Sequence, residues 1–98
     1  MREIRRTNEF TAWIRGLSDA KARAKIFVRI DRLRAGNSGD VKSVGRGVSE
    51  MRIDHGPGYR VYFAQRGTVV VLLLCGGIKS TQVDDITAAK ALAEHWKD

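Results

Sequence analysis

The residues best suited to proton transfer and phosphate binding lie in one stretch, from Val48 to Gln82. The stretch combines a carboxylate, a histidine, two tyrosines, three cationic side chains and a polar run, in the order Glu50, Arg52, His55, Tyr59, Arg60, Tyr62, Lys79, Ser80, Thr81 and Gln82. Neighbouring antiparallel strands would bring Arg52, Arg60 and Tyr62 to one face of a sheet. Lys79 would lead into a helix N-terminus, where backbone N–H groups attract anions. The pattern therefore predicts a phosphate-binding face.

The spacing of the metal-binding residue types does not indicate a metal or cofactor site. His55 and His95 are isolated, and the lone cysteine, Cys75, has apolar neighbours, so the zinc-ligand pattern is missing. The glycines at 45–47 and 56–58 lack the strand-to-helix context of a phosphate loop, and we expect them to form turns. We expect neither a metal nor a cofactor.

The charge of the chain favours a polyanionic partner. Lys and Arg number 18 against 11 Asp and Glu, a net charge of +7 on 98 residues. Such an excess attracts RNA, DNA or a ribosome, because each neutralised phosphate releases counterions. A charge that serves solubility, or an acidic protein partner, is the alternative. The length fits one domain, residues 1–98.

The compartment is expected to be the cytoplasm. A single cysteine, Cys75, cannot form an intramolecular disulfide, and its apolar setting is typical of a small buried side chain. The first ten residues lack the apolar core of a signal peptide, and no apolar run approaches the roughly 18 residues of a membrane span. We therefore expect no membrane association.

Two helices are predicted before the candidate stretch. Residues 2–6 can form a short strand, and Thr7 or Asn8 can cap a helix that ends at Gly16–Ser18. A second helix can begin at Ser18 or Asp19 and end near Ala35. The apolar stripes of the two helices are Phe10, Trp13, Ile14 and Leu17, then Ile26, Phe27, Ile30 and Leu33. The other face of the second helix is either solvated or bound to phosphates, and it carries Lys21, Arg23, Lys25, Arg29 and Arg32.

Three strands and a helix are predicted for the rest of the chain. The strands span Val48–Asp54, Tyr59–Gln65 and Thr68–Cys75, and the short turns between them favour an antiparallel meander. Alternation gives this sheet one core face and one functional face. The final helix, with Thr81 and Asp84 as a capping pair, has apolar positions Val83, Ile86, Ala89, Ala93 and Trp96.

Three segments carry a resemblance to a known family. They are Ser-Glu-Met-Arg-Ile at 49–53, Gly-Pro-Gly-Tyr-Arg-Val-Tyr-Phe at 56–63 and Leu-Leu-Cys-Gly-Gly-Ile-Lys-Ser-Thr-Gln at 73–82. Together they resemble the addiction-module killer protein branch (HigB/RelE-like) of the RelE/ParE toxin superfamily. The resemblance implies an α+β, RelE-like fold, in which an N-terminal helical hairpin packs on a small, largely antiparallel sheet followed by a C-terminal helix.

The resemblance also implies a function. Members are type II toxins held inactive by a cognate antitoxin, often a helix-turn-helix protein encoded by the adjacent gene, in a toxin–antitoxin hetero-oligomer. RelE-like members cut mRNA on the ribosome without a metal, with the 2′-hydroxyl as nucleophile. Arg60 and Lys79 fall where the nucleases carry basic residues near the scissile phosphate, and Arg52 matches another basic strand position. ParE-like members bind DNA gyrase instead, and this is the alternative function. A binder without toxicity is a third.

The proton-transfer residues stay open. Glu50 stands where ribonuclease members often carry lysine, so it is either a general base or the ion-pair partner of Arg52 or Arg60. His55 has a suitable intrinsic pKa but stands beside a turn, where it can equally be a solvated loop residue. Tyr62 is expected to stack on an RNA base, whereas Tyr59 is expected in the core. Ser80, Thr81 and Gln82 are expected at the phosphate.

Overall fold

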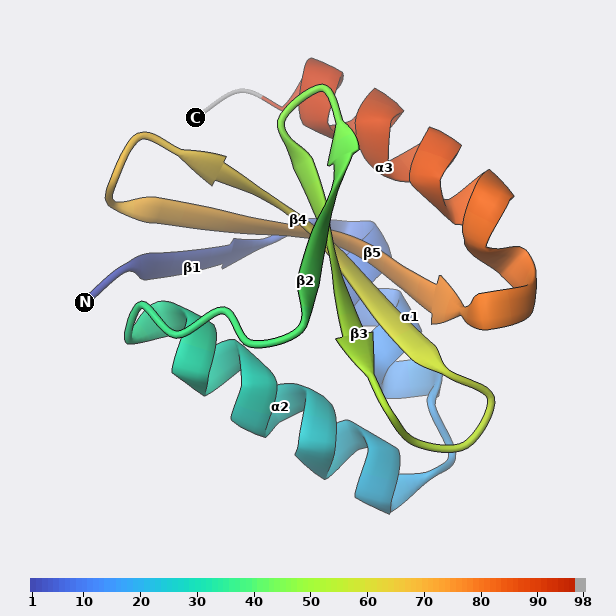
Figure 1. The fold of residues 1–98 in the computed structure, drawn as a ribbon. Helices are drawn as coiled ribbons and strands as arrows, with labels where there is room; N and C mark the ends of the chain where they lie inside the picture. Colours follow the sequence, from blue (N-terminus) through green and yellow to red (C-terminus); the bar gives the residue numbers. More distant parts are fainter. Residues whose placement is uncertain (97–98) are drawn as a thin grey trace.

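The computed structural model describes residues 1–96, which form an α+β fold around one five-stranded mixed sheet (Figure 1). The strand order is β1-β5-β4-β3-β2. The elements along the chain are β1 Glu3–Arg6, α1 Asn8–Gly16, α2 Ala20–Arg34, β2 Val41–Gly45, β3 Val48–Ile53, β4 Tyr59–Arg66, β5 Val70–Ile78, the 3₁₀ turn η1 Lys79–Thr81 and α3 Gln82–His95. The architecture is the one that the RelE-like resemblance implies.

Strands β2 to β5 form an antiparallel meander, and only β1 runs parallel to its neighbour, β5. The turns at 45–47 and 56–58 were predicted, and both contain glycines with positive φ. Strand β2 was not predicted, because Val41 and Val44 are its only apolar side chains, and most of its residues are exposed. Strand β5 also continues past Cys75, through Gly76 and Gly77 to Ile78.

Helices α1 and α2 begin at side-chain caps that the sequence predicts. The hydroxyl of Thr7 accepts a hydrogen bond from the Phe10 N–H at 3.0 Å, and the carboxylate of Asp19 accepts one from the Ala22 N–H at 3.1 Å. These bonds satisfy backbone donors that the first turn leaves unpaired. The caps therefore fix where each helix starts relative to the sheet.

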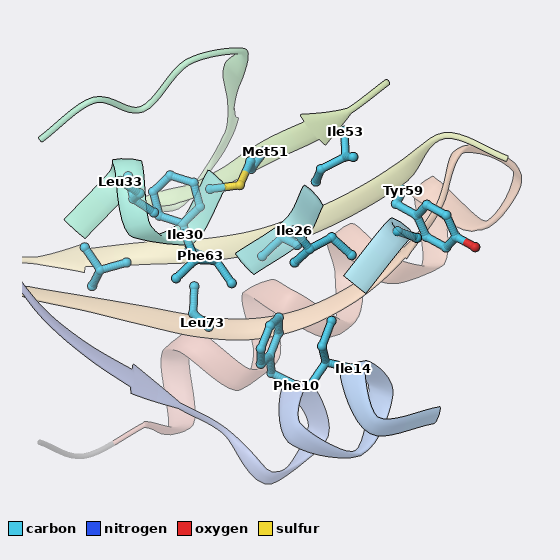
Figure 2. Close-up of a cluster of buried hydrophobic side chains, with 13 residues drawn as sticks. Phe10, Ile14, Ile26, Ile30, Leu33, Met51, Ile53, Tyr59, Phe63 and Leu73 are labelled. Carbon is cyan, nitrogen blue, oxygen red and sulfur yellow. The ribbon is translucent and has the colours of Figure 1, made fainter. Parts of the chain in front are cut away.

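One face of the sheet forms the larger core with α1 and α2 (Figure 2). Phe10 from α1 and Ile26 from α2 are fully buried against sheet residues such as Met51 and Phe63. Phe27 was predicted in this core, but it is 40% exposed, and the guanidinium of Arg6 lies 5.9 Å from its ring centroid. The helix presents Ile26, Ile30 and Leu33 to the sheet, and Phe27 lies beside that stripe.

The opposite face of the sheet, predicted as the functional face, packs against α3. Tyr62, Leu72 and Leu74 are fully buried there, and the helix contributes the buried Ala89 and Ala93 with the partly buried Ile86 and Leu92. Val83 was predicted on the apolar stripe of α3 but is 79% exposed. The end of this face near Arg52 and Arg60 opens into a pocket. Within residues 1–96, no helix is long and apolar enough to cross a bilayer.

Candidate functional site

Glu50 lies fully buried at the centre of a polar network beneath α3. Its Oε1 accepts a hydrogen bond from Nε of Arg52 at 2.9 Å. Its Oε2 accepts bonds from the Tyr62 hydroxyl at 3.0 Å and from Nε2 of Gln82 at 2.8 Å. Desolvation raises the pKa of this carboxyl, but the bonds from Arg52, Gln82 and Tyr62 outweigh it, so the pKa lies below its usual value. Glu50 is therefore an ionised anchor and a poor general base.

The second partner of this carboxylate is Arg60, on the adjacent strand. Arg52 and Arg60 are directly paired across β3 and β4, and Nε of Arg60 lies 4.0 Å from Oε1 of Glu50. The Arg60 side chain is only 12% exposed, and its Nε finds no hydrogen-bond acceptor among residues 1–96. A buried donor without an acceptor is costly, and the carboxylate of Glu50 at 4.0 Å offsets part of that cost through its charge. Of the two readings of Glu50, the geometry favours the ion pair.

Arg60 reaches a pocket of about 470 Å³ at the end of the sheet. The pocket is lined by three cationic side chains, two carboxylates and the β3–β4 turn, namely Arg52, Arg60, Lys79, Asp40, Asp54, Ile53, Gly56, Pro57 and Gly58. The Lys79 N–H donates to the Pro57 carbonyl at 3.4 Å, which joins the turn to η1. The structure thus brings together Arg52, Arg60 and Lys79, the three cations predicted from the sequence.

Gly58 and Arg29 hold the rim of this pocket. Gly58 has φ +81°, and a Cβ there would lie 3.2 Å from the Lys79 Cβ, so the turn and η1 are in close contact. The Arg29 guanidinium donates to the carbonyls of Arg52 at 2.6 Å, Ser38 at 3.3 Å and Asp40 at 3.2 Å. Arg29, one of the basic residues predicted on the outer face of α2, is therefore a structural tie between α2, β3 and the 38–40 loop.

His55 does not line the pocket, although it belongs to the turn that does. Its Nε2 lies 2.9 Å from Oδ2 of Asp19, the cap of α2, and its ring stacks on Tyr59 with centroids 6.3 Å apart. The bond to His55 is the main reason that the pKa of Asp19 is lowered. The geometry supports a structural role, in which His55 fastens the β3–β4 turn to α2.

The remaining predicted contact residues occupy different environments. Tyr62 is fully buried, so the prediction that its ring stacks on an RNA base is wrong for this conformation: α3 covers the ring, and its hydroxyl serves Glu50. Ser80 and Thr81 are exposed on η1, while Gln82 is turned inward to Glu50. Thr81 donates to Oδ2 of Asp85 at 2.5 Å, and the predicted capping pair with Asp84 is not formed.

Sequence reasoning missed two carboxylates, Asp40 and Asp54, which are exposed and line the pocket beside the cations. Asp54 follows the last residue of β3, and Asp40 precedes β2, so only the β2–β3 pairing brings them to one site. The unpredicted strand β2 is the reason that no local pattern reveals them. Among residues 1–96, no three His, Cys, Asp or Glu side chains are grouped as a metal site would require.

Comparisons with known proteins place the chain in a family. The model of the phage-derived Gp49-like family (DUF891) matches residues 12–95. An uncharacterized protein of Haemophilus influenzae is 52% identical over 92 residues, which cover 94% of this chain and 93% of the relative. No solved structure matches the chain. Since the family model spans most of the sequence, the chain belongs to the phage-derived Gp49-like family, a toxin-like family of type II toxin–antitoxin systems.

Proposed function

We propose that the chain is the toxin of a type II toxin–antitoxin system and cleaves mRNA on the ribosome, in the cytoplasm. The observation that carries this proposal is Arg60, a largely buried guanidinium that lines one pocket with Arg52 and Lys79 and whose Nε has no acceptor among residues 1–96. Three cations at one pocket suit the charge of a phosphodiester in its transition state. Ser80 and Thr81 on η1 extend the same surface toward the RNA backbone.

The reaction is an attack of the RNA 2′-hydroxyl on its own 3′-phosphate. The O2′–P bond forms as the P–O5′ bond breaks, which leaves a 2′,3′-cyclic phosphate and a free 5′-hydroxyl. A base must take the 2′-proton, and the exposed carboxylates Asp40 and Asp54 line the pocket where such a base is needed. An acid must protonate O5′, and Lys79 is the ammonium group that lines the same pocket.

A ribosome-programmed cleavage assay tests the proposal. Purified ribosomes carrying a defined mRNA should yield cut transcripts with the wild-type chain, and Arg60→Ala and Lys79→Ala should each lower the rate about 10²–10³-fold. Lys21→Ala, which removes a charge from the exposed face of α2, is the matched control and should leave the rate unchanged. His55→Ala should cost less than Arg60→Ala. If Arg60→Ala and Lys79→Ala cleave as fast as the wild type, the assignment fails.

The partner follows from the family. A toxin-like protein of a type II system has a cognate antitoxin, and we propose a helix-turn-helix protein encoded by the adjacent gene that forms a hetero-oligomer with this chain. Expression of the chain alone should arrest growth, and co-expression of the neighbouring open reading frame should restore it. Growth that continues without the neighbour would contradict the toxin assignment.

Inhibition of DNA gyrase is the second candidate. The observation that favours it is Glu50, which neutralises part of the charge of Arg52 and Arg60. By the family resemblance, Glu50 also stands where RelE-like nucleases often carry lysine. A supercoiling assay with purified gyrase distinguishes the two functions. Inhibited supercoiling with intact mRNA on programmed ribosomes would replace the nuclease proposal with this one.

A further inference from the structure

A second cationic groove lies away from the candidate site, at the opposite ends of β3 and β4. It has a volume of about 410 Å³, and its walls are residues of the β2–β3 turn, the end of β4 and the last turns of α3. Figure 1 shows the β2–β3 turn beside the C-terminal end of α3. Its cations are Arg46, Arg66 and Lys90, and its one carboxylate is Glu94. The function proposed above uses none of these four residues.

Arg46 stands at the tip of the β2–β3 turn in an unfavourable backbone conformation. Its φ is +54°, and within residues 1–96 it is the one residue other than glycine with positive φ. Gly45 and Gly47 on either side also have positive φ, so glycine would suit all three positions. An arginine held in this region at a free-energy cost points to a role for its side chain.

The other two cations are held in place by the fold. The Nζ of Lys90 lies next to Gly45, 3.4 Å from where a Cβ would stand, so the α3 lysine meets the turn that carries Arg46. Nη2 of Arg66 donates to the Ala93 carbonyl at 2.5 Å, which ties the guanidinium to the last turns of α3 at the groove. The β2–β3 turn, β4 and α3 therefore each contribute one cation to the groove, whereas Glu94 is its one carboxylate.

We propose that this groove binds the phosphodiester backbone of RNA as a second contact, separate from the pocket of Arg60. An acidic peptide fits less well, because the apolar side chains at the groove are the small Ala64 and Ala93, which offer little to anchor a partner's large residues. Gln82 marks the catalytic end of α3 and Ala93 the groove end, about 16 Å apart along the helix. A strand of several nucleotides can therefore reach both sites.

The test is binding of a fluorescent 20-nucleotide 2′-O-methyl-oligouridylate, measured by anisotropy between 50 and 200 mM KCl. The ligand choice rests on the proposed function, but this probe lacks a free 2′-hydroxyl, so the readout is independent of cleavage. Arg46→Gly should weaken binding and lower the slope of log K against log salt by about 0.7, the value of one lost phosphate contact on a single strand. Adding Lys90→Ala should double that loss. Arg46→Lys should keep most of the slope, and Glu94→Gln should tighten binding.

Arg46→Gly is expected to fold, because glycine takes this φ readily. The matched control is the double variant Lys21→Ala and Lys25→Ala, which removes two exposed charges from α2. The proposal is overturned if this control lowers the slope of log K against log salt as much as Arg46→Gly with Lys90→Ala does. It is also overturned if the groove variant leaves that slope unchanged. Competition is a further test: displacement of the RNA probe by inorganic phosphate at the same phosphate concentration, or by polyglutamate at the same charge, would also overturn the proposal. The double variant Arg60→Ala with Lys79→Ala separates the two proposals. If it keeps the wild-type salt slope while Arg46→Gly with Lys90→Ala lowers it, RNA binding at the groove is supported and the proposed active site is contradicted.

Discussion

A carboxylate as deeply buried as that of Glu50 is costly unless donors surround it. Arg52, Tyr62 and Gln82 supply the hydrogen bonds, and Arg60 adds a charge at 4.0 Å. The same arrangement keeps the Arg60 side chain largely out of water, and within residues 1–96 its Nε has no acceptor. At the scale of single residues, Glu50 thus positions the arginine that we propose to meet the phosphate.

Glu50→Gln is expected to destabilise the fold. The amide keeps the size of the side chain but leaves Arg52 and Arg60 without an anion, and loss of one partner from a buried ion pair costs about 2–4 kcal/mol. Urea denaturation at pH 7 measures the free energy of unfolding. Glu94→Gln, an exposed carboxylate, is the control and should change it by less than about 0.5 kcal/mol.

The pH dependence of the free energy of unfolding, compared between the wild type and Glu50→Gln, gives a second check. Because the folded pKa of Glu50 is below its reference value of 4.5, its contribution is complete above pH 4.5 and is lost as the pH falls through the folded pKa. The wild type should therefore lose stability below pH 4.5 more steeply than Glu50→Gln. Parallel curves from pH 7 to pH 3 would contradict the assigned role.

At the residue scale, the sequence predicts the positions of the cationic side chains better than those of the neutral polar ones. Arg52, Arg60 and Lys79 line one pocket as expected, since strand pairing and the chain order after β5 place them. Tyr62 lies on the predicted face, but alternation along a strand cannot reveal that α3 covers that face. Asp40 escaped notice because β2 carries too few apolar residues to be recognised as a strand.

Among the elements, β5 depends on two glycines for its contacts with both helical layers. A Cβ at Gly76 would lie 2.2 Å from the Trp13 ring of α1, and one at Gly77 would lie 1.8 Å from Oδ2 of Asp85 in α3. The backbone of β5 can approach these groups only without side chains. The pair Gly-Gly after Cys75 was read as the end of the strand, whereas it continues it.

Gly76→Ala should therefore destabilise the fold by about 1–3 kcal/mol, the range for overpacking a filled site. Thermal or urea unfolding measures the change. Gly16→Ala at the end of α1 is the control, because nothing lies within 4 Å of a Cβ there, and it should be neutral or slightly stabilising. Similar losses in the two variants would show that the contact with Trp13 is not the cause.

The helices were predicted more closely than their packing. Both caps and the ends of α1 and α2 follow from local sequence, since capping needs only residues a few positions apart. Which apolar side chains are buried depends on the partner surface. Phe27 and Val83 therefore remain exposed, although their spacing fits an apolar stripe.

At the scale of the molecule, one sheet joins two cores. Trp13 packs against the core formed with α1 and α2, and Trp96 packs against the core formed with α3. Residues of β3, β4 and β5 alternate between the two, so neither core can persist without the sheet. The chain should unfold in one cooperative step.

Single-tryptophan variants test this expectation. Trp96→Phe leaves Trp13 as the fluorescent reporter of the first core, and Trp13→Phe leaves Trp96 as the reporter of the second. Within each variant, the urea midpoint from fluorescence should coincide with that from far-UV circular dichroism. A fluorescence transition that precedes loss of the sheet signal would reveal a core that opens alone.

The parallel pairing of β1 with β5 has a consequence for synthesis. Glu3 pairs with Val70, and the Thr7 hydroxyl donates to the Leu74 carbonyl 67 positions later. At about 5–20 residues per second, that gap corresponds to roughly 3–13 s of translation. Gln82, which completes the donors around Glu50, is made later still. The nascent chain therefore has no finished site until the ribosome that makes it has added Gln82.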